Sequence, residues 1–282
     1  MHGAGNDFVV IDRRAAMEPF DPALARRLGN RHTGIGFDQL MSIETPRTQG
    51  AVASYSILNP DGSRARQCGN GARAVAAWLV REGSAPANGE FLLDSPAGSV
   101  RAWALPDGRF RIDMGEPDFS PAAIGPAAIE LDVDAGDPHA HELVLDDGSR
   151  MSIGIVSMGN LHAVIEVDDA DTADVARIGP ALQRHPAFRN GCNVGFAQVL
   201  DATRLRLRVH ESGAGETLAC GSGACAAVAV FRRRGMLGEN VQVQLPGGTL
   251  ELGWAGTGST ILMTGPARFV FEGEYSEGDF TQ

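Results

Sequence analysis

Two cysteines occur in the same glycine-rich setting at distant points of the chain. Cys68 begins the segment CGNGA and Cys220 begins the segment CGSGA. Each segment passes into an alanine-rich apolar run, so each cysteine is predicted to lie where a glycine-rich turn enters a helix. Unpaired backbone N–H groups and the positive end of the helix dipole meet there, which attracts anions and lowers the pKa of a thiol. We therefore expect a thiolate near neutral pH at such a position.

A pair of such thiols suits proton exchange at a carbon stereocentre. Inversion requires a base on one face of the carbon and an acid on the other, so one cysteine must be a thiolate while its partner is a thiol. The backbone N–H groups, with the side chains of Asn70 and Ser222, can bind a substrate carboxylate as the α-proton leaves. The alternative is that both cysteines are small buried residues, but burial alone does not require the flanking glycines to repeat.

The basic residues exclude one common cofactor, because all 24 of them are arginine. Pyridoxal phosphate is bound covalently through a lysine. A GxxxxGK[ST] loop also needs a lysine, which binds the phosphates of its ligand, so such a loop is excluded as well. No metal site is predicted either, since His139-x-His141 and the Cys220–Cys225 spacing lack a convincing second pair of ligands. Cys192 and Cys225 are interpreted as packing residues. We expect no cofactor and no metal.

Composition indicates a small-molecule substrate. The net charge of -11 argues against nucleic acid or an anionic membrane surface as a partner. No apolar stretch is long enough to span a bilayer, and the N-terminus lacks the features of a signal peptide, so we expect a cytoplasmic protein. A length of 282 residues favours two domains.

A single long repeat covers nearly the whole chain. The segments GNDFVVID, QCGNGARAVAAWLV, SPAGSV and MGEP recur in the same order as GNLHAVIEVDD, ACGSGACAAVAVF, LPGGTL and MTGP. This predicts two duplicated domains, residues 1–117 and 118–282, related by an approximate twofold axis. It is left open that the extreme C-terminus packs back on the first half.

The predicted fold class is α+β. Many short alternating or β-branched segments, separated by Gly, Pro and Asp, predict strands, and the two alanine-rich runs predict interior helices. Each of the two pseudo-symmetric domains is expected to be a curved, mainly antiparallel sheet wrapped around a central helix, with the active site in the cleft between domains. Residues 117–151 lack clear periodicity and are interpreted as the crossover.

Eight motifs together resemble one known family. HGAGNDF, GFDQ, NPDGS, QCGNGAR, SMGN followed by LH, NVGF, ESGAGET and ACGSGACA occur in this order and closely resemble diaminopimelate epimerases. The resemblance implies interconversion of LL- and meso-diaminopimelate in lysine and peptidoglycan precursor synthesis, a closed form that excludes water, and a homodimer. It implies Cys68 and Cys220 as the catalytic pair, with His162 and Glu211 tuning their protonation. The substrate-binding positions that it implies are Asn6, Gln39, Asn59, Gly69, Asn70, Asn160, Asn193, Glu211, Ser212, Gly221 and Ser222.

The sequence departs from the family pattern at several positions. Ser212 stands where the family usually has an arginine that helps to hold the distal end of the substrate, and serine cannot supply a charged, bidentate fork. Leu161 replaces a usual proline and Ala4 a usual leucine, both interpreted as packing changes. The chain begins at the HGAGNDF motif, so either the true start lies upstream or the first strand is shortened.

Two other functions compete with this interpretation. A related two-cysteine racemase with a different substrate is favoured by Ser212. A cysteine hydrolase using one thiol with His162, or a non-catalytic binding protein, is disfavoured because it needs only one thiol or none. His162 also has a structural interpretation, as an ordinary histidine in the alternating segment NLHAVIEV.

Overall fold

The chain folds into two compact units in the computed structural model, which describes residues 1–16, 18–125, 131–134, 136–188 and 191–275. Unit 1 comprises Met1–Ile112 together with the residues from Thr264 onward, and unit 2 comprises Asp113–Met263. The chain passes from one unit to the other within β8 (Phe110–Asp113) and again within β18 (Leu262–Gly265). In the described part of the chain no helix is long and apolar enough to cross a bilayer.

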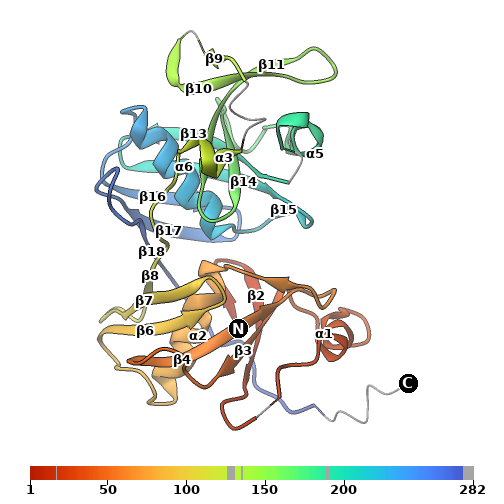
Figure 1. Cartoon of the computed structure of the whole chain (residues 1–282), viewed down its shortest axis with the longest axis vertical. Coiled ribbons are helices and arrows are strands. Elements are labelled where there is room, and N and C mark those ends of the chain that lie inside the picture. Colours follow the sequence, from red (N-terminus) through yellow and green to blue (C-terminus); the bar gives the residue numbers. More distant parts are fainter. Residues whose placement is uncertain (17, 126–130, 135, 189–190, 276–282) are drawn as a thin grey trace. The chain divides into compact units, whose positions relative to one another are not determined.

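The described residues of unit 1 form short strands and two helices (Figure 1). In chain order these are β1 (His2–Gly3), β2 (Asn6–Asp12), α1 (Pro22–Gly29), β3 (Gln39–Glu44), β4 (Ala51–Leu58), β5 (Arg64–Ala65), α2 (Gly69–Arg81), β6 (Gly89–Ser95) and β7 (Gly98–Ala104). Strand β2 pairs parallel with β3, and β4 pairs antiparallel with β3 and parallel with β6. The hairpin β6–β7 is antiparallel, as is the pairing of β7 with β8.

Unit 2 repeats this order after an added N-terminal portion. Its elements are α3 (Pro121–Ile124), β9 (Val133–Asp134), β10 (Asp137–Val144), β11 (Arg150–Ser157), β12 (Leu161–Glu166), α5 (Val175–Arg184), the 3₁₀ turn η1 (Pro186–Phe188), β13 (Asn193–Asp201), β14 (Arg204–Glu211), β15 (Gly215–Thr217), α6 (Gly221–Arg233), β16 (Asn240–Leu245) and β17 (Gly248–Gly253). Strand β12 pairs parallel with β13, and β14 pairs antiparallel with β13 and parallel with β16. The pairings of β12 to β17 thus match those of β2 to β7, which confirms the duplication predicted from the sequence.

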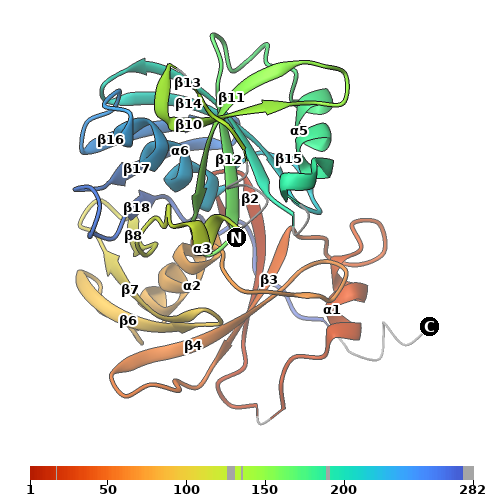
Figure 2. The ribbon, with the colours of Figure 1, turned by 45° about the horizontal axis from the view of Figure 1, so that its top comes forward.

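The alanine-rich helices α2 and α6 form the interior of their units. Alanine has the highest helix propensity, and its small side chain lets strands pack closely on every face. Helix α2 packs on β1, β2, β3 and β7, and α6 packs on β11 to β14 and on β17 (Figure 2). Both begin directly after a cysteine and end in basic residues, Arg81 in α2 and Arg232 with Arg233 in α6, which complement the helix dipole. The predicted interior helices and α+β fold class are confirmed.

The segment interpreted as a crossover contains more structure than its sequence suggested. Strand β10 lies within it and pairs antiparallel with β11 in unit 2. Its sequence, DPHAHELV, starts with Asp and Pro, which are depleted in strands, and this explains why no strand was predicted. Residues 126–130 and 135 of the same segment lie outside the described part of the chain.

Candidate active site

Cys68 occupies the N-cap of α2. Its extended backbone conformation (φ -154°, ψ 102°) directs the side chain over the first helical turn, where Sγ accepts a hydrogen bond from the N–H of Gly71 at 3.3 Å. A backbone N–H that points at sulfur stabilises the thiolate more than the thiol. This bond and the helix dipole both favour the charged form.

The second glycine of each motif is required by close packing. A Cβ atom on Gly71 would lie 2.7 Å from Sδ of Met41, and one on Gly223 would lie 3.0 Å from Cγ2 of Val209. In both cases it would also lie 3.3 Å from Sγ of the preceding cysteine. A side chain at either position would press on the thiol and on the neighbouring Met41 or Val209 side chain, which favours glycine at this position in both motifs.

Cys220 occupies the equivalent N-cap of α6 but has different surroundings. Its thiol is buried and donates a hydrogen bond to Oε2 of Glu211 at 3.0 Å, with Oγ of Ser222 at 3.6 Å. The other carboxylate oxygen of Glu211 accepts from Oγ1 of Thr217 at 2.6 Å, across the β14–β15 hairpin. Burial, followed by the negative charge of Glu211, raises the pKa of the Cys220 thiol well above its ordinary value. Cys220 is therefore a thiol in this structure. The lowered pKa expected for a thiol at the start of a helix is wrong for this cysteine, because burial and Glu211 outweigh the helix dipole.

One non-repeated position adds to the difference between the two cysteines, beyond the deeper burial of Cys220. Glu211 precedes Cys220 by the same interval that separates Asn59 from Cys68. Asn59 carries no charge, and its amide accepts from Nε2 of Gln39 at 3.1 Å and donates to Oγ of Ser63 at 3.0 Å. Unit 1 thus has an uncharged amide where unit 2 has a carboxylate that accepts a hydrogen bond from Cys220.

Three further predicted residues gather at the start of α6. His162, on β12, is buried and its Nε2 lies 3.1 Å from Oδ1 of Asn160. Nδ2 of Asn160 in turn lies 3.4 Å from Oγ of Ser222. Burial lowers the pKa of His162 to about 3, so the imidazole is neutral at physiological pH. It can orient Asn160, but it adds no positive charge there.

Asn193 and Ser212 form a separate contact at the ends of β13 and β14. Oδ1 of Asn193 accepts from the backbone N–H of Ser212 at 2.9 Å. The Ser212 side chain is exposed, and a Cβ atom on Gly191 would lie 2.8 Å from its Oγ. Gly191 also has a φ of +82°, which favours glycine. The backbone of Ser212 is thereby fixed, whereas its side chain faces solvent.

Unit 1 gathers a second polar group at the start of α2. Nδ2 of Asn70 lies 3.5 Å from Oδ1 of Asn6, and Oδ1 of Asn70 accepts from Nη2 of Arg73 at 2.8 Å. Arg73 is completely buried, and its Nε donates to the backbone oxygen of Pro266 at 3.2 Å. Arg73 was not among the site residues predicted from the sequence. A lone cation inside an otherwise apolar helical run was the signal that could have found it.

The other two cysteines lie in hydrophobic cores. Cys192 is buried in a cluster with Leu182 and Phe196, and burial raises its pKa to about 12. Cys225 is buried inside α6. Among the residues that the structure describes, no group of three His, Cys, Asp or Glu side chains could hold a metal ion.

Comparison with known proteins decides the family. The family model for diaminopimelate epimerase matches residues 1–120 and 154–270. The chain belongs to the diaminopimelate epimerase family. A diaminopimelate epimerase of Xanthomonas axonopodis pv. citri (strain 306) is 52% identical over 98% of this chain and 95% of its own length. One from Xylella fastidiosa (strain M12) is 53% identical over 97% of this chain and 94% of its own length.

One relative is named for a different substrate. An O-ureido-serine racemase of Streptomyces lavendulae is 51% identical, covering 98% of this chain and 93% of its own length. Solved structures extend the fold further: a probable proline racemase of Agrobacterium radiobacter K84 matches with a TM-score of 0.68 at 18% identity, covering 96% of this chain and 92% of the other. A hydroxyproline epimerase of Agrobacterium vitis matches with a TM-score of 0.67 at 16% identity, covering 94% and 87%. At these identities the structures show the shared fold alone.

The neutral, buried His162 predicts an acid-sensitive stability. In the unfolded chain a histidine has its ordinary pKa of about 6.5, so below that pH the unfolded state binds a proton that the folded state does not. This part of the free energy of unfolding is lost as pH falls from the unfolded pKa toward the folded value of about 3. By pH 5 the loss is about 2 kcal/mol.

The variant His162→Phe tests this prediction, because it removes the titratable group and Phe8 occupies the equivalent position in unit 1. Urea unfolding at pH 7 and pH 5 should show a larger loss of stability in the wild type than in the variant. Equal losses in the two proteins would contradict a neutral His162.

Proposed function

We propose that this protein is a diaminopimelate epimerase that interconverts LL- and meso-diaminopimelate without a cofactor, in lysine and peptidoglycan precursor biosynthesis. Family membership supports the substrate. The observation that carries the chemistry is the pair of N-cap cysteines in opposite electrostatic settings, with Cys68 accepting an N–H bond and Cys220 donating to Glu211. We propose the reaction site in a cleft between the two units, in a cytoplasmic homodimer.

In the proposed mechanism the two thiols divide the proton transfer. The Cys68 thiolate removes the α-proton from one face of the substrate, and the Cys220 thiol delivers its own proton to the opposite face. The products are a Cys68 thiol, a Cys220 thiolate and the inverted carbon, so the proton balance closes. The next turnover in the reverse direction uses the same groups with exchanged roles, and the two thiols titrate as a coupled pair.

The helix N-termini supply the stabilisation that an α-carbanion requires. Negative charge moves toward the substrate carboxylate as the proton leaves, and preorganised N–H donors lower the energy of that state. Gly69 with Asn70 in unit 1, and Gly221 with Ser222 in unit 2, provide those donors in our proposal. The remaining substrate contacts are assigned to Asn6, Gln39, Asn59, Asn160 and Asn193. Glu211 controls the protonation of Cys220, and the neutral His162 orients Asn160.

A second candidate function is racemisation of an amino acid whose distal end is uncharged. Ser212 favours it, because the exposed hydroxyl provides no positive charge for a distal carboxylate. The Streptomyces lavendulae relative, named for O-ureido-serine, has a neutral ureido group at that end of its substrate. The two candidates share the thiol chemistry and differ only in distal recognition.

Side-by-side kinetics with LL-diaminopimelate and O-ureido-L-serine test the proposed function. We expect turnover of LL-diaminopimelate with formation of the meso isomer, detected by chiral chromatography. Exclusive turnover of O-ureido-L-serine would replace the first candidate by the second. Absence of both activities in a reduced, folded protein would overturn the proposal.

Ser212→Arg is expected to improve the binding of diaminopimelate. A guanidinium that pairs with the distal carboxylate contributes about 1.5 kcal/mol, so KM should fall about tenfold while kcat changes little. Ser212→Gln is the matched control, because it adds length and hydrogen-bonding groups without a charge. If KM is the same in Ser212→Arg and Ser212→Gln, position 212 does not face the distal carboxylate.

A further inference from the structure

The same pair of side chains meets at the start of each central helix, but in opposite orientations. In unit 1 Oδ1 of Asn6 faces Nδ2 of Asn70 at 3.5 Å. In unit 2 it is Nδ2 of Asn160 that faces Oγ of Ser222, at 3.4 Å. Asn6 is equivalent to Asn160 in the repeat, and Asn70 is equivalent to Ser222. The oxygen of one asparagine and the nitrogen of the other are therefore turned toward the helix start.

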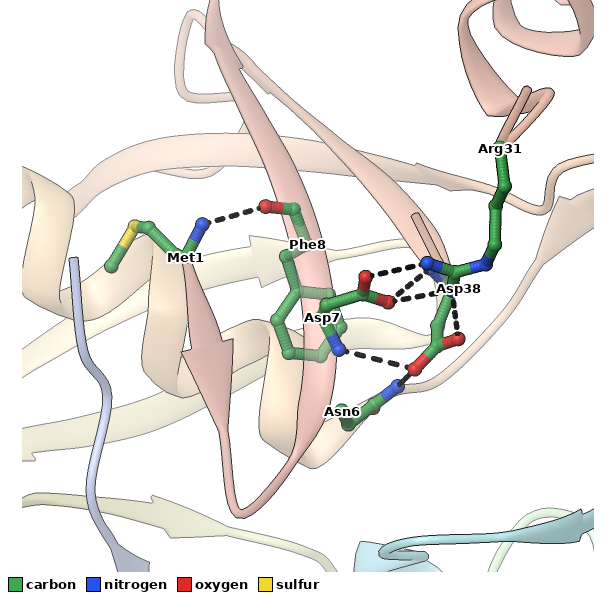
Figure 3. A network of polar contacts seen from close by, with 6 residues as sticks. All are labelled: Met1, Asn6, Asp7, Phe8, Arg31 and Asp38. Carbon is green, nitrogen blue, oxygen red and sulfur yellow. Dashed lines mark hydrogen bonds and ion pairs between the residues drawn. The ribbon is translucent and has the colours of Figure 1, made fainter. Parts of the chain in front are cut away.

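An anionic side chain accounts for the orientation of Asn6 (Figure 3). Oδ2 of Asp38 accepts a hydrogen bond from Nδ2 of Asn6 at 2.6 Å. An ionised carboxylate has no hydrogen to donate, so it binds the nitrogen end of the amide and leaves the oxygen facing the other way. Such charge-assisted bonds are about twice as strong as neutral ones. In unit 2 the strand register places Cys192 at the position of Asp38, because His162 pairs with Asn193 as Phe8 pairs with Gln39. A cysteine has no carboxylate that could hold Asn160 in this way.

The carboxylate of Asp38 is itself fixed from several directions. Nη2 of Arg31 donates to Asp38 Oδ1 at 2.7 Å, and the same guanidinium contacts both oxygens of Asp7 at 2.9 Å (Figure 3). The backbone N–H of Asp7 donates to Asp38 Oδ2 at 3.1 Å, while the backbone N–H of Asp38 donates to Asp7 Oδ1 at 2.7 Å. These bonds join β2 to the residue before β3 and leave Asp38 little rotational freedom.

We infer that Asp38 is a positioning residue, which holds Asn6 so that its amide oxygen rather than its NH2 group faces the start of α2. This inference rests on the proposed function, in which Asn6 contacts the substrate. An oxygen acceptor suits the ammonium group of a zwitterionic amino acid. The neighbouring Asn70 has its oxygen bonded to Arg73, so it presents N–H donors that suit the carboxylate. Unit 1 thereby offers adjacent groups of opposite polarity.

The variant Asp38→Asn tests this role, because an amide can bind either end of Asn6. We expect KM for LL-diaminopimelate to rise about tenfold while kcat changes less than about threefold. The same measurement is made with O-ureido-L-serine if that is the substrate turned over. In the Asn6→Ala background, Asp38→Asn should have no further effect on KM, because Asp38 acts through Asn6.

Asp12→Asn is the matched control. Asp12 lies on β2, the strand that begins at Asn6, and pairs with Arg14. Its side chain is 34% exposed, compared with 44% for Asp38, and its ion pair is with Arg14 rather than a contact with Asn6. We expect wild-type kinetics from it. An unchanged KM in Asp38→Asn, equal effects of the two variants, or additive effects of Asp38→Asn and Asn6→Ala would overturn the inference.

A measurement independent of turnover separates this inference from the proposed function. In ¹⁵N-labelled wild-type protein, the side-chain NH2 protons of Asn6 should exchange with solvent more slowly than those of an exposed asparagine, since one of them is bonded to Asp38. Rapid exchange in the wild type would overturn the positioning role even if the enzyme is active. Slow exchange in a protein without epimerase activity would leave the positioning of Asn6 intact and overturn the proposed function instead.

Discussion

Replacing either N-cap cysteine by serine is expected to lower kcat by about a hundredfold to ten-thousandfold. The Cys68→Ser hydroxyl can still accept the Gly71 N–H bond, and serine is a favoured N-cap residue, so the start of α2 should remain intact. A serine hydroxyl does not ionise near neutral pH, however, and cannot act as the base. The same loss is expected for Cys220→Ser, because one face of the substrate would lack a proton donor.

The two core cysteines provide the controls for this prediction. Cys192→Ala and Cys225→Ala remove buried sulfur atoms at positions away from the helix N-caps. Their kcat values should stay within about threefold of wild type, although each variant loses some stability through the cavity that it leaves. Wild-type kcat in Cys68→Ser or in Cys220→Ser would contradict the two-thiol mechanism.

Glu211→Gln is expected to lower kcat about tenfold to a hundredfold and to shift its pH dependence. Glutamine keeps the size of the side chain and its bond to Thr217 but removes the negative charge that, after burial, raises the pKa of Cys220. The pKa of Cys220 should therefore fall, so the thiol loses its proton at a lower pH. The alkaline limb of the pH–rate profile should move to lower pH.

Glu216→Gln is the matched control for that variant. Glu216 lies on the same β14–β15 hairpin and pairs with Arg208 at 2.6 Å, away from the thiol. Its pH–rate profile should coincide with that of the wild type. If the alkaline limb moves equally in both variants, or moves in neither, Glu211 does not control the protonation of Cys220.

The positions of the two thiols that we propose as catalytic could be predicted from sequence, because their signal is local and duplicated. An alanine-rich run that follows Cys-Gly-x-Gly indicates a helix start, and the structure places Cys68 and Cys220 at the N-caps of α2 and α6. The strands followed from alternation in the same way. Residues that are neighbours in the sequence determine both the helix starts and the strands.

Features that depend on non-local contacts could not be predicted. The pairing of Asp38 with Asn6 joins the segment before β3 to the start of β2, and the buried Arg73 reaches the backbone of Pro266. Strand β10 exists because β11 provides its hydrogen-bond partners, while its own sequence is polar. The neutral state of His162 likewise depends on complete burial, which a single sequence does not reveal.

The most direct test of the two-thiol account is α-proton exchange in deuterated buffer, followed by NMR under reducing conditions without added cofactor. LL-diaminopimelate, O-ureido-L-serine, proline and glutamate are offered in separate samples. The account predicts that deuterium enters the α-carbon of diaminopimelate together with the appearance of the meso isomer, and that proline and glutamate do not exchange. Absence of exchange in all four amino acids by a folded, reduced protein would contradict it.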